Sequence, residues 1–214
     1  MKQYGRGLWF TLIELLVVIS IVALLASILL PALRKSWETA RKVKCAGNLK
    51  QCYLGFIAYA DDYAGYLPSP KDHLGSSEWR WRYKISPYLN AEGKENIANS
   101  KTVFECPSTP TNQVHSYGIN NRIAQGFATD YEYTAPKLSA FKYPAKRLLL
   151  ADENEIMTII ASYGTDSCTI GVEYRHNNRA NFLFVDGSAR DYHFTLLPKY
   201  GDYDSWTYYY TGTK

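Results

Sequence analysis

The chain of 214 residues has few of the residue patterns that form catalytic or cofactor sites. It contains only four histidines and four cysteines, and the histidines are scattered without the short spacing that is typical of metal ligands. The sequence also has no serine-nucleophile motif and no glycine-rich phosphate-binding loop. We therefore expect neither an enzyme nor a resident metal or cofactor.

Glycine, proline and charge are also too sparse for several classes of protein. With 14 Gly, 9 Pro, 21% charged and 46% hydrophobic residues, the chain is not collagen-like, low-complexity or disordered. Its negative mean hydropathy excludes a polytopic membrane protein but permits a single span. The net charge of +4 resides in the first fifty residues, because the remainder is slightly acidic. We therefore expect no nucleic-acid partner.

One segment could suggest the opposite, because residues 79–84 alternate aromatic and basic side chains. Such a pattern can stack on and neutralise single-stranded nucleic acid. Six residues in a near-neutral domain more often pack at the edge of a helix or strand, and we favour that interpretation.

A long apolar segment runs from Leu8 to Leu30. As a helix it would rise about 35 Å, enough to cross a bilayer core of about 30 Å. The segment is longer than the core of a cleaved secretory signal, and Pro31 and a basic stretch follow it in place of a cleavage site. We therefore expect a retained membrane span. Glu14 is the charged residue within this segment. A carboxylate within a membrane span usually has a partner unless it lies near the interface.

The string FTLIELLVVI at Phe10–Ile19 is preceded by Lys2 and Arg6 and followed by Pro31. Over residues 6–33 the sequence resembles the N-terminus of type IV prepilins and type II secretion pseudopilins. The resemblance implies a structural subunit of a type IV pilus-like or pseudopilus filament, assembled through its N-terminal helix. The alternative is a monomeric, membrane-anchored exported binding module for carbohydrate or matrix that uses a pilin-like N-terminus. An exported hydrolase is a third, more distant possibility.

The resemblance also assigns roles to individual residues. It implies that a prepilin peptidase cuts between Trp9 and Phe10, that Phe10 is then N-methylated, and that Glu14 sets the axial register against other pilin-like subunits. Family substrates usually have glycine before the Phe, so Trp9 predicts slower cleavage. The implied location is the inner membrane in a single pass, with the N-terminus cytoplasmic and the C-terminal domain periplasmic, or extracellular after assembly.

The implied fold is α+β, a pilin-like lollipop with a long N-terminal helix packed on a C-terminal antiparallel β-sheet with loop-rich insertions. The expected parts are a leader at 1–9, a transmembrane helix at 10–30, an amphipathic continuation at 31–62 and a periplasmic globular domain at 63–214. Pro31 is expected to kink the helix without ending it.

Periodicity in the sequence supports the second half of this helix. Apolar residues recur at steps of four and three, which predicts one buried helical face that ends near Asp61. The residues of this seam are Cys45, Leu49, Cys52, Phe56 and Tyr59.

The C-terminal half reads as β-structure, with short apolar strands expected at 147–152 and 181–185. Asp186-Gly187 separates the second of these from a strand-like segment at 188–193, which predicts a hairpin with a type I′ turn. The spacing of His176 and Asp186-Gly187 also resembles the H-X9-DG domain of prepilin-like proteins from the Planctomycetes, Lentisphaerae and Verrucomicrobia group. We expect structural roles for this motif at 176–187, with His176 bonded to a turn and Asp186 shaping the hairpin.

The four cysteines suggest disulfides in an exported domain. Cys45 and Cys52 lie about 10 Å apart on a helix, beyond the roughly 7 Å that a disulfide spans, so they do not pair with each other. Each pairs with Cys106 or Cys168, pairs outside the chain, or stays reduced in the core. The H-X9-DG resemblance includes Cys45 and the Cys106-Pro107-Ser108 string, which implies a Cys45–Cys106 bridge and leaves Cys52 to Cys168 or reduced.

The C-terminal tail offers a second place for a ligand. Two aspartates in the segment 201–205 could supply oxygen ligands, and pseudopilins bind calcium in a C-terminal loop. Two aspartates in a loop are a common pattern, so calcium stays a minor expectation.

Overall fold

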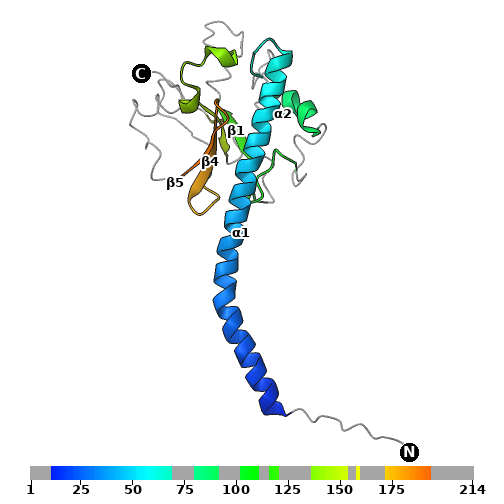
Figure 1. The fold of residues 1–214 in the computed structure, drawn as a ribbon, viewed down its shortest axis with the longest axis vertical. Helices are drawn as coiled ribbons and strands as arrows, with labels where there is room; N and C mark the ends of the chain where they lie inside the picture. The colour runs from blue at the N-terminus through cyan, green and yellow to red at the C-terminus, as the bar shows by residue number, and fades with distance from the viewer. Residues whose placement is uncertain are drawn as a thin grey trace, which may run out of the picture. The chain divides into compact units, whose positions relative to one another are not determined.

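The computed structural model describes residues 11–68, 80–91, 102–110, 116–120, 136–153, 158–159 and 172–193. The chain divides into two compact units, Met1–Thr39 and Ala40–Lys214. The longest element, α1 (Leu12–Asp62), begins in the first unit and ends in the second (Figure 1). The shorter helical elements are α2 (Arg80–Ile85), η1 (Ser86–Leu89), η2 (Leu138–Ala140) and η3 (Pro144–Lys146).

The first unit contains the apolar half of α1. The helix continues past Pro31, whose expected kink stays a prediction. The large apolar side chains between Leu12 and Leu33 are exposed. Among the described residues, α1 is the one helix long and apolar enough to cross a membrane. It is therefore a candidate membrane anchor.

The second unit contains a five-stranded sheet of order β3-β1-β2-β4-β5. Its strands are β1 (Tyr117–Asn120), β2 (Leu148–Asp152), β3 (Thr158–Ile159), β4 (Arg179–Phe184) and β5 (Ala189–His193). The pairs β1–β2, β2–β4 and β4–β5 are antiparallel, whereas the short β3 joins β1 in parallel. The predicted α+β class is confirmed, and its antiparallel sheet gains this one parallel edge strand.

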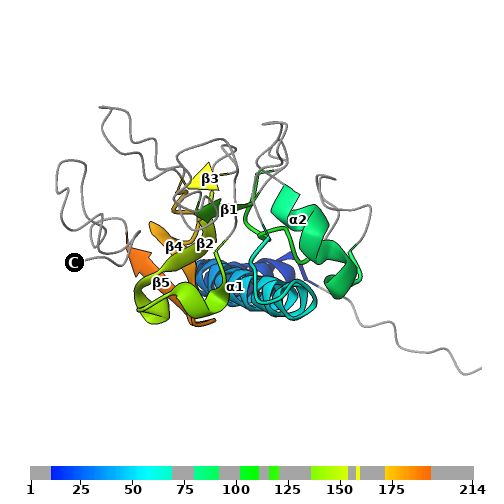
Figure 2. The ribbon, with the colours of Figure 1, turned by 90° about the horizontal axis from the view of Figure 1, so that it is seen from above.

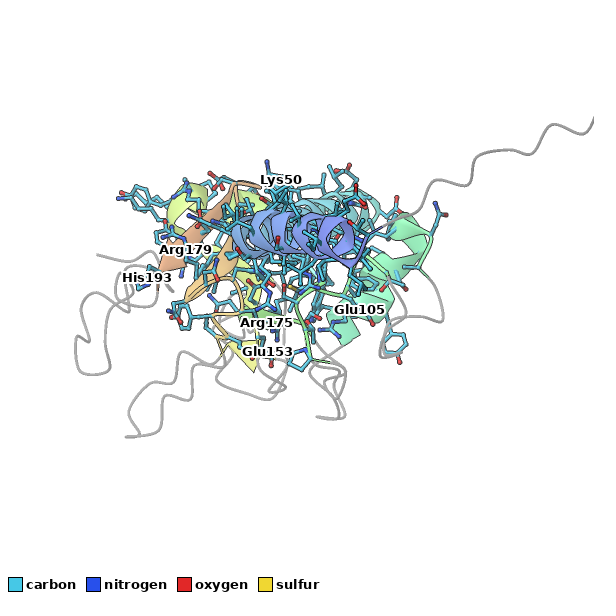
Figure 3. The ribbon with its side chains drawn as sticks, turned by 90° about the horizontal axis from the view of Figure 1, so that it is seen from below. Lys50, Glu105, Glu153, Arg175, Arg179 and His193 are labelled. Atoms are coloured by element: carbon cyan, nitrogen blue, oxygen red, sulfur yellow. The ribbon has the colours of Figure 1, made fainter. Side chains whose placement is uncertain are left out.

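The second half of α1 lies across one face of the sheet (Figure 2). All five residues of the predicted seam are buried, which confirms it. They share one core with side chains of β1, β2 and β4, whereas Lys50 projects from the opposite, exposed side of α1 (Figure 3). The other face of the sheet carries a second apolar cluster that includes Phe182 and Phe184.

The central strand β2 is buried along its whole length. Its register against β4 shifts between Leu148 and Leu150, as in a β-bulge. The irregularity explains why the neighbouring Leu149 and Leu150 both join the core under α1, since strict alternation would place them on opposite faces.

The aromatic and basic segment contributes to this core. Trp81 stacks on Phe56 of α1 with ring centroids 5.5 Å apart, and Trp81 and Arg82 are both buried. Trp79 lies outside the described residues. The two buried side chains agree with the packing interpretation of this segment.

The expected hairpin joins β4 to β5, but its predicted type I′ turn is wrong. A type I′ turn needs positive φ at both central residues. Gly187 has φ of 80°, whereas Asp186 has no positive φ. The Gly187 N–H donates to the Phe184 carbonyl at 2.9 Å, and Asp186 Oδ1 accepts from the Ser188 N–H at 2.9 Å. The connection is therefore a three-residue loop that ends in a left-handed glycine. The Asp186 carboxylate holds this loop by accepting from Ser188.

Candidate functional site

The start of α1 places Glu14 in contact with Thr11. The Thr11 backbone N–H and hydroxyl each donate to Glu14 Oε2 at 2.8 Å, and the Glu14 N–H donates to Thr11 Oγ1 at 3.2 Å. This reciprocal arrangement is a capping box, for which the string Thr-Leu-Ile-Glu is the sequence signal. Glu14 thus has a local partner in the free chain. Trp9 and Phe10 lie outside the described residues.

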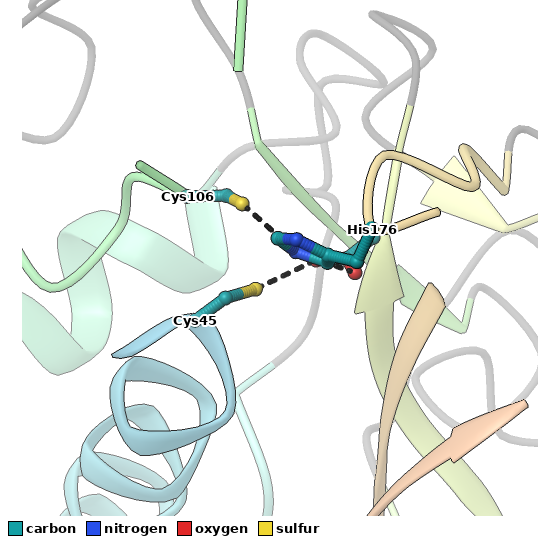
Figure 4. Close-up of side chains that lie close together, drawn as sticks. Cys45, Cys106 and His176 are labelled. Carbon is teal, nitrogen blue, oxygen red and sulfur yellow. Dashed lines mark hydrogen bonds and ion pairs between the residues drawn. The ribbon is translucent and has the colours of Figure 1, made fainter. Parts of the chain in front are cut away.

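A second candidate site lies in the globular unit, where four polar side chains from distant segments meet. We call Cys45, Cys106, Asp152 and His176 the buried cluster. Each offers one sulfur, oxygen or nitrogen atom, and these atoms all lie within 4.8 Å of one another. Figure 4 shows the thiols of Cys45 and Cys106 turned toward the His176 ring.

The first half of the buried cluster joins α1 to the end of β2. Cys45 belongs to the buried seam of α1, and its Sγ donates to Asp152 Oδ1 at 3.0 Å. The Tyr117 hydroxyl donates to Cys45 Sγ at 3.3 Å. The Asn181 backbone N–H of β4 donates to Asp152 Oδ2 at 2.7 Å. The carboxylate thereby replaces a main-chain acceptor at the edge of the β2–β4 pairing.

Cys106 is positioned by a tight turn. The Thr109 N–H donates to the Cys106 carbonyl at 2.9 Å, and Pro107 occupies the second turn position, where its fixed φ is favourable. The Cys106 Sγ lies 3.4 Å from His176 Nε2. The turn therefore presents the thiol to the imidazole.

His176 is positioned by the turn that leads into β4. Its backbone exchanges two hydrogen bonds of 3.1 Å with Arg179, and Asn177 and Asn178 have φ of 53° and 61°. Positive φ at both central residues is the mark of a type I′ turn, and asparagine tolerates it better than most residues. The His176 Nε2 lies 3.7 Å from Asp152 Oδ2, which closes the buried cluster.

Burial and mutual contact shift the acidity of these groups. Burial raises the pKa of the Cys45 thiol well above its usual range and that of the Asp152 carboxyl to about 7. Contact with Cys45, with a further contribution from His176, lowers the pKa of Cys106 against the effect of burial. This environment favours the thiolate form of Cys106, one of the ligand types that soft and borderline metal ions prefer.

The described cysteines form no disulfide in the structure. Cys45 and Cys106 do come together, but both are free thiols in the structure, so the implied bridge is not formed there. Cys52 is also free and buried, with its Sγ 3.8 Å from the Val103 carbonyl. Cys168 and the tail at 201–205 lie outside the described residues.

The two parts of the H-X9-DG motif act at opposite ends of β4. The backbone of His176 forms a turn, as expected, while its ring enters the buried cluster. At the other end the Tyr53 hydroxyl donates to the Val185 carbonyl at 3.1 Å, and Gly187 packs against the Tyr53 ring. The motif thus fixes β4 and its hairpin to α1.

Sequence reasoning missed Asp152 and, with it, the gathering of four side chains of metal-ligand type. The ligand-type residues stand at positions 45, 106, 152 and 176, so no short spacing marks them. The available signal was weaker: a cysteine on the buried seam, a Cys-Pro turn, a strand ending in Asp and a histidine beside an Asn-Asn turn.

A comparison with known protein families finds a match in the N-terminal part of the chain. A family described as a protein of unknown function (DUF1559), typically of prepilin-like proteins, matches residues 35–102. No curated protein and no solved structure matches the chain. The matched range includes Cys45 and Cys52 and the core face of α1.

Proposed function

We propose that the chain is a structural subunit of a pilus-like or pseudopilus filament that is anchored in the inner membrane by α1 and assembles through it. The carrying observation is the exposed apolar surface of α1 between Leu12 and Leu33, with one carboxylate near its start. A large exposed apolar surface marks a membrane or protein interface. The match to DUF1559 supports the same assignment.

In this proposal the prepilin peptidase first releases Phe10 as the new N-terminus. The Glu14 carboxylate then exchanges its bonds to Thr11 for the N-methylated amine of a neighbouring subunit. Because both charges lie in an apolar environment, either one left alone is costly, and their pairing selects the correct axial register. Apolar contacts between helices thus hold the filament together, and one ion pair for each subunit sets the axial register.

The structure allows the charge of Glu14 to be tested separately from its capping role. Glu14→Gln keeps a side chain that completes a capping box but removes the charge. Thr11→Ala removes the capping hydroxyl and keeps the carboxylate. We expect Glu14→Gln to reduce filament incorporation at least about tenfold, because it leaves an amine unpaired, and Thr11→Ala to stay close to wild type.

Incorporation is measured by immunoblotting of sheared filaments from cells with a complete assembly system. Membrane fractions of the same cells give the control, since both variants should stay anchored at wild-type levels. Equal incorporation of Glu14→Gln and wild type would contradict the register role. A wild-type chain that is exported and anchored but never found in filaments would favour the monomeric binding module.

Processing gives an independent prediction. We expect slow cleavage between Trp9 and Phe10 and faster cleavage in Trp9→Gly, because the family peptidase usually accepts glycine at this position. Mass spectrometry of the detergent-extracted chain reports the fraction that begins at a methylated Phe10. An N-terminus at Met1 in both proteins, in cells with active peptidase, would refute cleavage at this site.

A further inference from the structure

The buried cluster has the composition and the dimensions of a metal site. It offers two sulfurs, one imidazole nitrogen and one carboxylate oxygen, and these atoms all lie within 4.8 Å of one another. Cys45 Sγ lies 3.0 Å from Asp152 Oδ1, Cys106 Sγ lies 3.4 Å from His176 Nε2, and His176 Nε2 lies 3.7 Å from Asp152 Oδ2. Around a tetrahedral zinc ion with bonds of about 2.0–2.3 Å, the donor atoms lie about 3.3–3.8 Å from one another. Small side-chain adjustments would bring the cluster to that geometry.

The burial of the cluster points to the same conclusion. Cys45, Cys106, Asp152 and His176 are each at most 3% exposed. Thiols, a carboxyl and an imidazole that meet at one buried point are uncommon in a core, because buried ionisable groups are costly unless they are paired or coordinate a metal. A divalent cation would neutralise two of the anionic ligands and replace their weak mutual hydrogen bonds with coordinate bonds.

The surroundings supply the hydrogen bonds that orient metal ligands. The Tyr117 hydroxyl donates to Cys45 Sγ, and the Asn181 N–H donates to Asp152 Oδ2. Cys45 and Asp152 thus each receive a donor from outside the cluster. Such outer contacts are a regular feature of protein metal sites, since they fix each ligand and balance its charge.

We propose that the buried cluster binds one Zn²⁺ ion through Cys45, Cys106, Asp152 and His176. The two sulfurs favour zinc over hard cations such as calcium or magnesium. Four protein ligands complete a tetrahedral shell, so the site is structural rather than catalytic. The ion would link the buried face of α1 to the Cys106 turn, the end of β2 and the turn before β4.

This inference goes beyond the proposed filament function and does not depend on it. A zinc ion and a Cys45–Cys106 disulfide are mutually exclusive, because both use the same two sulfurs. The free thiols at hydrogen-bonding distance from Asp152 and His176 favour the ion. In the bridged chain the carboxyl and imidazole would keep their burial and lose their sulfur partners.

The test uses the full chain, exported from cells in zinc-containing medium and extracted in detergent without chelator or reductant. Elemental analysis is expected to give about one zinc per chain in the wild type. Cys106→Ser and His176→Gln each remove or alter one ligand and should reduce zinc affinity at least about tenfold. Cys52→Ser is the matched control, because Cys52 is a buried thiol on the same seam of α1 and lies outside the cluster.

A measurement on the wild type alone covers the case in which the ligand variants fail to fold. X-ray absorption at the zinc edge should show two sulfur neighbours at about 2.3 Å and two lighter ones at about 2.0–2.2 Å. Three outcomes would overturn the proposal. They are a wild type that takes up no zinc even after reduction and dialysis against it, a Cys45–Cys106 disulfide in the exported chain, and zinc retained equally by His176→Gln and wild type.

Discussion

Replacement of Gly187 by alanine is expected to lower the free energy of unfolding by about 2–5 kcal/mol. Gly187 has φ of 80°, a conformation that costs a residue with a Cβ about 1–2 kcal/mol. A Cβ there would also lie 2.5 Å from Tyr53 Cε1, and the ring cannot move freely because its hydroxyl bonds the Val185 carbonyl. Such overpacking typically adds about 1–3 kcal/mol.

Urea unfolding of the detergent-extracted chain measures this loss, and a double-mutant cycle separates its two causes. In Tyr53→Ala the clash is gone, so Gly187→Ala should then cost only its backbone share. Gly47→Ala is the matched control, because Gly47 lies inside α1 with open space around it and should gain up to about 1 kcal/mol. A Gly187→Ala chain as stable as wild type would show that the hairpin does not pack on α1 in this way.

The long helix and its buried face could be predicted because local pattern decides them. Both patterns depend on a single helix and on which part of it avoids water. They are the apolar segment, which is long enough to cross a bilayer, and the spacing of four and three residues from Cys45 to Tyr59. The β4–β5 hairpin is local for the same reason. Its turn type is not local, because both Asp186-Gly187 and Asn177-Asn178 suit positive φ. The three-residue loop after β4 also depends on the packing of Gly187 on Tyr53 of α1, a contact between distant segments.

The meeting of the two cysteines with Asp152 and His176 was not predicted, because it depends on how distant strands pair. Cys45 and Asp152 meet because α1 crosses the face of β2, and His176 joins them because β4 pairs with β2. A shift of β4 by one residue would turn its side chains to the other face. The parallel pairing of β3 with β1 also joins distant parts of the sequence. A strand of two residues is too short for its sequence to indicate which strand it pairs with.

A second large loss of stability is expected on replacement of Arg82, which lies in α2 and is buried. Its Nη2 donates to the Tyr117 carbonyl at 2.7 Å, so it ties α2 to β1. Burial lowers the pKa of Arg82, but the charge of the equally buried Glu153 opposes this shift and keeps the guanidinium cationic. Arg82→Met preserves most of the apolar stem and removes the charge. We expect it to cost about 3–5 kcal/mol, since it leaves the buried Tyr117 carbonyl without this donor and removes a buried positive charge that Glu153 stabilises.

The neighbouring position supplies the control for this prediction. Tyr83 follows Arg82 in α2 but is 44% exposed, so Tyr83→Ala should cost less than about 1 kcal/mol. Glu153→Gln combined with Arg82→Met should recover part of the loss, because the double variant removes both of the interacting charges. Urea unfolding of the wild type, Arg82→Met, Glu153→Gln and the double variant gives the coupling between the two charges. If Arg82→Met costs no more than Tyr83→Ala, or if Glu153→Gln adds its full cost on top, the stability of this core rests on apolar packing around Trp81 and not on the buried charge pair.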